Sequence, residues 1–161
     1  MKFHALGVVA ATVAFVSLVL PWWEVSVTYD GGFSVSHYLW GYQLEGKFFL
    51  WEPLAGGIDV ETLLFGPMPC LAFALMVTCG TVQVIASIIA KGNQKLMLGL
   101  AGIFSMLSII FFAVWELHGV LEVTSLGSYL SISLNPSFGF GSGIIASVLT
   151  VVAYIKYPKG K

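Results

Sequence analysis

The stretch SLVLPWWEVSVTYDGGFSVS, from Ser17 to Ser36, changes character twice within twenty residues. It begins as the end of an apolar run suited to lipid, and then meets a proline and two tryptophans. Apolar and polar residues alternate after the tryptophans, which is typical of a half-buried strand. The DGG tripeptide at 30–32 tolerates positive φ, so the stretch predicts a β-hairpin that starts directly after a membrane helix.

The composition places the whole chain in a membrane. Of the 161 residues, 58% are hydrophobic and only 9% are charged, whereas soluble domains carry about 25% charged residues. We therefore expect residues 1–161 to form a single integral membrane domain whose first partner is the lipid bilayer. The seven basic residues are scattered lysines without a basic cluster, so we expect no nucleic acid partner. Cys70 and Cys79 lie nine apart in one apolar stretch, too far along a helix to pair with each other.

Four apolar stretches are long enough to cross a bilayer, which takes roughly 20 helical residues. We predict spans at about 3–20, 69–90, 96–117 and 138–155, connected by long loops at 21–68 and 118–137. The first stretch lacks a small-residue cleavage site before Pro21, and we expect it to be a retained helix and not a cleaved signal.

The charges divide sharply between the segments that connect these spans. The amino end, the loop at 91–95 and the tail at 156–161 hold six lysines and no acid. The regions 21–68 and 116–136 hold all eight acids and one lysine, Lys47. Because lysine-rich short loops stay on the cytoplasmic side, this division predicts a multi-pass protein of the cell membrane with both termini cytoplasmic.

Tryptophans fall at the predicted boundary between the spans and the outer loops. Trp22 and Trp23 follow the first span, and Trp115 lies near the end of the third. Aromatic belts at membrane interfaces have this placement, so we predict that these side chains anchor helix depth.

The outer loops carry further strand signals. A second hairpin is predicted around the turn Glu45-Gly46, and YLSISLN near 129–134 alternates in the same way. A single hairpin is marginal in water, so we expect five short strands to form one antiparallel sheet over the outer helix ends. The fold class is therefore membrane α+β, a four-transmembrane-helix bundle with a small extracellular antiparallel sheet.

LPWWEVSV after the first span and YLWGYQ further on resemble the claudin and peripheral-myelin-protein family. The resemblance matches Trp22 or Trp23 to the family's first tryptophan and Leu39-Trp40 to its leucine-tryptophan pair. Tyr38 stands where the family has glycine, and the family's cysteine pair is absent, with Gln43 near the first position. The resemblance implies four spans, inner termini, a first outer loop of β-strands and a non-catalytic role in adhesion or partner binding.

The spans offer little chemistry. None contains Asp, Glu, Lys or Arg away from its ends, which argues against a pump or coupled transporter. Gln83 is expected to hydrogen-bond between helices. Glu116, His118 and Glu122 form the best polar candidate site, although Glu116 and His118 would point about 200° apart on a helix. In an extended turn they could share a face with His37, so a metal site there remains an alternative; no cofactor is predicted.

Two sets of residues are candidates for contacts. Small residues recur at helical spacing, which permits close helix packing within the bundle or against a partner: Gly139, Gly143 and Ser147, with Gly7 and Ala11, and Gly99 with Gly102. Aromatic residues gather in the first outer loop, either as a partner surface or as a cover for the helix ends: Trp40, Phe48, Phe49 and Trp51.

These patterns favour a non-catalytic membrane interaction or scaffold protein, a subunit or contact module of a larger assembly. Its partners would be other membrane protein subunits or further copies of itself. One alternative is an oligomeric channel or carrier for a small neutral solute, with Gln83 and Ser87 along the path. A further alternative is an accessory subunit of a membrane oxidoreductase, or an enzyme acting on a quinone or lipid, which would need the titratable groups near Glu116.

Overall fold

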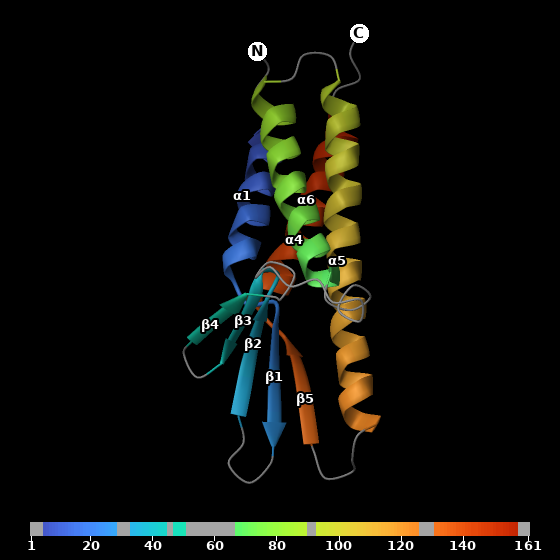
Figure 1. The fold of residues 1–161 in the computed structure, drawn as a ribbon. Helices are drawn as coiled ribbons and strands as arrows, with labels where there is room; N and C mark the ends of the chain where they lie inside the picture. Colours follow the sequence, from blue (N-terminus) through green and yellow to red (C-terminus); the bar gives the residue numbers. More distant parts are fainter. Residues whose placement is uncertain are drawn as a thin grey trace.

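The computed structural model describes residues 5–28, 33–44, 47–50, 67–89, 93–125 and 131–157. Helices run side by side in an elongated bundle, and an antiparallel sheet lies at one end of it (Figure 1). We call this end the sheet end. At the opposite end α1 begins, α5 begins and α6 ends, and there lie Lys95 and Lys156, so we call it the lysine end.

The described part of the chain contains four α-helices: α1 (Ala5–Val19), α4 (Pro67–Val84), α5 (Gln94–Ser125) and α6 (Phe138–Lys156). A five-residue π-helix, η1 (Ile85–Ile89), continues α4. Among the described residues, three segments are long and apolar enough to cross a membrane: Met68–Ile88, Gln94–His118 and Phe138–Lys156. The apolar α1 has 15 described residues, or about 22 Å at 1.5 Å per residue, against a hydrocarbon core of about 30 Å.

The helix α5 is longer than the span predicted at 96–117. It continues to Ser125, so the segment 118–137, predicted to be a loop, begins as helix. Val120 and Leu121 keep helical spacing with Leu117, and the helix runs through Gly119, the first glycine after the predicted span. The predicted span was defined by the apolar run alone, whereas the helix continues beyond that run to Ser125.

The sheet has five antiparallel strands in the described residues, as predicted. They are β1 (Trp23–Thr28), β2 (Phe33–Tyr38), β3 (Gly41–Leu44), β4 (Lys47–Leu50) and β5 (Ser131–Pro136). The order is β4-β3-β2-β1-β5, so β1 lies between its hairpin partner β2 and the distant β5. Val25 faces Val35 on one side and Leu134 on the other. The strand that precedes α6 is thereby hydrogen-bonded to the strand that follows α1.

The bundle packs closely because its interior is built from small residues. α1 and α5 each pack against both α4 and α6, and the fully buried residues include Ala14, Ala72, Ala146 and Ala153. Small side chains let helix backbones approach one another in lipid, where the hydrophobic effect does not drive helices together.

Hydrogen bonds between polar side chains join the packed helices. Ser108 on α5 donates to the Ala72 carbonyl on α4 at 2.6 Å. The Ser105 and Ser147 hydroxyls, on α5 and α6, lie 2.7 Å apart. Gln83 on α4 donates to the Thr150 hydroxyl on α6, the helix–helix role expected from the sequence. These bonds form in a medium without competing water, so they fix the register of the helices.

Trp22 is fully buried at the junction between bundle and sheet. Its ring makes edge contacts with Phe112 on α5 and Phe140 on α6, at centroid distances of 5.2 and 5.8 Å. Its backbone N–H donates to the His37 carbonyl at 2.7 Å, and its carbonyl accepts from the Ser137 N–H at 2.9 Å. The prediction of an interfacial anchor is therefore wrong for Trp22, because its indole fills a site inside the protein.

Two tryptophan N–H groups cap the end of α1. Pro21 has no N–H, so the Ser17 carbonyl lacks the donor that a continuing helix would supply. The Trp22 indole donates to that carbonyl at 2.8 Å. The Trp40 indole, from the turn between β2 and β3, donates to the next carbonyl, that of Leu18, at 2.9 Å.

The small residues of α6 face the interior of the bundle and accommodate this tryptophan. A Cβ atom on Gly139 would lie 2.6 Å from the carbonyl oxygens of Leu20 and Pro21, and one on Gly143 would lie 3.0 Å from the Trp22 ring. Ser147 is buried farther along α6. Gly7 and Ala11 are likewise buried on α1, the helix that packs against α6. The sequence left open whether the small residues pack within the bundle or against a partner. In the structure the following residues pack within the bundle: Gly139, Gly143, Ser147, Gly7 and Ala11.

The close approach at Gly139 yields a matched pair of variants on one helix. Gly139→Ala should lower the free energy of unfolding by about 1–3 kcal/mol, because its methyl group collides with backbone carbonyls that cannot move aside. Gly141→Ala should be neutral or stabilising, since a Cβ there meets no atom within 4 Å and alanine favours the helix. Thermal unfolding in detergent measures both; equal stability of the two variants would contradict the packing described here.

Candidate functional site

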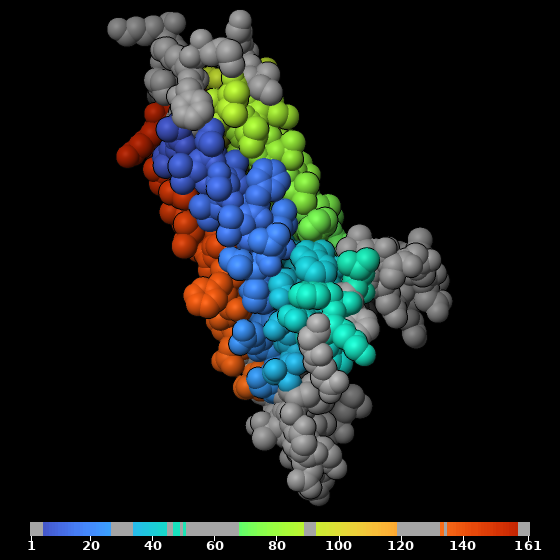
Figure 2. All heavy atoms as spheres, turned by 90° about the vertical axis from the view of Figure 1, so that its left-hand side faces the viewer, coloured from blue at the N-terminus to red at the C-terminus, as the bar shows by residue number. Residues whose placement is uncertain are grey.

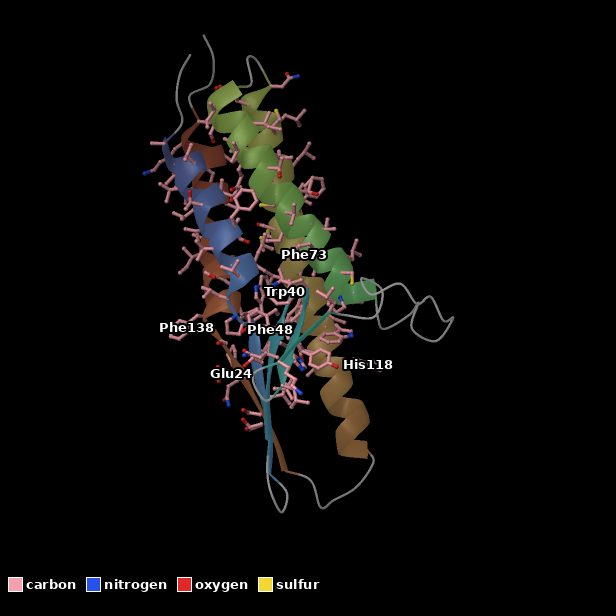
Figure 3. All side chains as sticks on the ribbon, turned by 60° about the vertical axis from the view of Figure 1, so that its left-hand side comes forward. Glu24, Trp40, Phe48, Phe73, His118 and Phe138 are labelled. Atoms are coloured by element: carbon pink, nitrogen blue, oxygen red, sulfur yellow. The ribbon has the colours of Figure 1, made fainter. Side chains whose placement is uncertain are left out.

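An aromatic surface lies on the sheet where it meets the end of α1, and we define it as Tyr38, Trp40, Phe48 and Leu50. The rings of Tyr38 and Trp40 have centroids 5.0 Å apart, and Phe48 lies 5.8 and 5.7 Å from these two rings. Figure 3 shows Trp40 and Phe48 close together at the junction of bundle and sheet. Phe48 is 57% exposed and Leu50 is 52% exposed, so the surface is open on its β4 side.

The inner part of the aromatic surface is held rigidly. Trp40 is tied to α1 through its bond to the Leu18 carbonyl. Tyr38 is buried and donates its hydroxyl to the Gln43 side chain at 3.2 Å. Burial, with a smaller contribution from the Glu24 carboxylate, raises the pKa of the Tyr38 phenol, which keeps it a neutral donor. The exposed side chains of β4 therefore rest on a fixed support.

Two of the residues predicted for an outer interaction surface lie on this aromatic surface. Trp40 and Phe48 belong to it, while the Phe49 side chain and Trp51 lie outside the described residues. Trp40 also covers the end of α1, so the two roles considered from the sequence coexist in one side chain. Leu50 was missed because only aromatic residues were considered. Its position two residues after Phe48 on a strand gives it the same face, a signal present in the sequence.

A second feature at the sheet end joins β2 to α5. The His37 Nδ1 and the Glu116 Oε1 lie 2.6 Å apart. The Glu116 side chain is only 5% exposed and that of His37 is 18% exposed. The Trp115 ring lies 5.9 Å from the imidazole ring. The bond brings together residues 79 positions apart and fixes the central part of the sheet to the longest helix.

The structure describes the side chains of two of the three residues predicted as a polar site, Glu116, His118 and Glu122. All three belong to α5, so Glu116 and His118 are on a helix and not in an extended turn. Glu116 bonds to His37, the first-loop residue considered from the sequence. The Glu122 side chain lies outside the described residues. Over the part of the chain that the structure describes, no three His, Cys, Asp or Glu side chains are placed to hold a metal ion.

The residues considered for a solute path lie inside the bundle. Gln83 and Ser87 are both fully buried. The Gln83 amide donates to Thr150 and to the Cys79 sulfur, while its carbonyl oxygen and the Ser87 hydroxyl have no hydrogen-bond partner among the described residues. Gln83 therefore connects α4 to α6 through Thr150.

We expect the contributions of His37 and Glu116 to stability to be energetically coupled. In a double-mutant cycle of His37→Ala and Glu116→Ala, the coupling free energy should be about 1.5–3 kcal/mol, because each variant alone leaves a poorly solvated polar partner behind. The control cycle combines Glu116→Ala with Lys47→Ala, since the exposed Lys47 lies on β4, two strands from β2. That cycle should be additive within about 0.5 kcal/mol. Denaturation in detergent provides the values; additivity in both cycles would contradict the coupling.

Comparisons with known proteins identify no family for this chain. The chain matches no protein-family model and no curated protein sequence. The likeness to the claudin and peripheral-myelin-protein family therefore rests on the residues between Leu20 and Gln43 alone, and it stays a prediction. The features that bear on function are the aromatic surface and the hydrogen bond between His37 and Glu116.

Proposed function

We propose that this protein is a non-catalytic membrane interaction protein, a subunit or contact module of a larger membrane assembly with a claudin-like architecture. The observation that carries the proposal is the aromatic surface, whose Phe48 and Leu50 side chains are more than half exposed on a rigid support. Exposed apolar side chains grouped on one face are typical of a surface that another molecule covers.

The position of β4 supports a partner that is itself a protein. Within the described sheet β4 has one neighbour, β3, and is the terminal strand. A terminal strand offers backbone groups to an added strand, and alternate side chains such as Phe48 and Leu50 then provide specificity. In Figure 2 the strands from β2 to β4 lie beside the sheet end of α1, so a partner would meet both the sheet and the bundle.

In this proposal the helices anchor and position the sheet. The residues considered for lateral contacts, Gly139, Gly143 and Ser147, are buried against other parts of the chain, so the partner is assigned to the aromatic surface instead. The division of lysines and acids supports cytoplasmic termini and an external sheet.

The orientation can be tested by thiol labelling on intact cells. In a background of Cys70→Ser and Cys79→Ala, a cysteine replacing Ser34 on β2 should react with an impermeant thiol reagent. One replacing Asn93 before α5 should react only after the membrane is opened, because the lysine end faces the cytoplasm. Both positions are exposed in the structure, so protection reports the membrane and not burial. Labelling at position 93 from outside would reverse the topology.

The partner surface can be tested with a photocrosslinking amino acid at single positions. A photocrosslinking amino acid in place of Phe48 or Leu50 should give a crosslink to a specific membrane protein. The double variant Phe48→Ser/Leu50→Ser should no longer co-purify with that protein. The control position is Ser133, exposed on the opposite edge strand β5. The double variant should unfold within about 1 kcal/mol of wild type, as expected for exposed side chains. Equal crosslinking from Ser133, or none from either β4 position, would contradict the proposal.

A further inference from the structure

A groove runs along the outer side of the bundle between α5 and α6 at the lysine end. It has a volume of about 770 Å³. Gly99 and Gly102 form its floor on α5, because neither has a side chain to fill the space beside α6. Its walls are apolar side chains that are exposed on the bundle surface: Leu96, Leu100, Ile103, Met106 and Val151.

The mouth of the groove is polar and positively charged. Lys95, Asn93 and Tyr154 line it at the lysine end. The Lys95 ammonium lies 5.0 Å from the centre of the Tyr154 ring, a cation–π contact that holds the charge beside the groove. Tyr154 is 39% exposed and is itself a lining residue of the groove. An apolar channel that ends in a cation matches an amphiphile with an anionic head.

We propose that this groove binds one acyl chain of an anionic phospholipid, with the lipid phosphate at Lys95. The length of the groove supports this occupant. From Lys95 to Met106 the helix rises about 16 Å at 1.5 Å per residue. One leaflet of the hydrocarbon core is about 15 Å deep, so a chain lying in the groove would have its head at the level of Lys95.

Charge favours an anionic lipid over a second copy of the chain as the occupant. The segments at the lysine end hold six lysines and no acid in the sequence. Copies inserted in the same direction bring these like charges side by side, which opposes association along this end of the bundle. Anionic head groups are complementary to the same charges, and basic sites between membrane helices are typical places for them.

The test is lipid binding to the full chain in detergent, measured by native mass spectrometry with dioleoylphosphatidylglycerol and dioleoylphosphatidylcholine. The acyl chains are identical, so the comparison isolates the head group. The wild-type protein should bind phosphatidylglycerol about fivefold more tightly, and Lys95→Gln should remove this preference, as expected for one lysine near an anionic head. The matched control is Lys156→Gln, which removes the same charge from the end of α6 outside the groove and should change the affinity by about twofold or less.

A second variant tests the apolar part of the groove. Gly102→Leu places a side chain in the channel and should weaken binding of both lipids, while its Cβ makes only ordinary contacts with Thr150 at 3.7 Å. If this variant does not fold, the two lysine variants decide the question alone. Equal affinity of wild type for both lipids, or equal losses in the Lys95 and Lys156 variants, would overturn the site. A wild-type dimer that Gly102→Leu converts to monomer would assign the groove to a second copy instead.

Discussion

The architecture depends on how the chain ends its first helix inside an apolar environment. Pro21 deprives the Ser17 carbonyl of its helical donor, and the Trp22 indole supplies a replacement from the same turn. A carbonyl left without a donor at this depth would cost several kcal/mol. Because the indole must remain at that carbonyl, its ring is fixed between Phe112 and Phe140, and its backbone groups are fixed against His37 and Ser137. One residue thereby connects α1, α5, α6 and the strand β2.

The helices and strands were predictable because their signals are local. Apolar length and the alternation beside DGG define them without any knowledge of distant residues. The partners in the bonds that assemble them were not predictable, because each bond joins positions far apart: Trp40 to Leu18, His37 to Glu116, and Gln83 to Thr150. The sequence offered His37 only as one possible neighbour of Glu116. Spatial proximity of this kind is decided by packing, and periodicity carries no information on it.

Trp22 shows why the placement of a residue type can mislead. Tryptophan at a span boundary is typical of interfacial anchoring, because an indole has an apolar body and one polar N–H group. The same two properties suit a buried cap, where the ring packs and the N–H group serves a free helical carbonyl. Gly139 is the residue that indicates a buried cap and not an interfacial anchor. Without a side chain, it lets α6 approach the Leu20 and Pro21 carbonyls beside Trp22.

The length of α5 has a mechanical consequence. With 32 residues it is about 48 Å long, well beyond the hydrocarbon thickness, and it continues past the bundle beside the sheet (Figure 1). Glu116 lies near the point where the apolar segment ends and bonds there to the sheet through His37. Membrane helices answer a change in bilayer thickness by changing their tilt. Because Glu116 fixes the sheet to α5 through His37, a change in the tilt of this helix would carry the sheet with it.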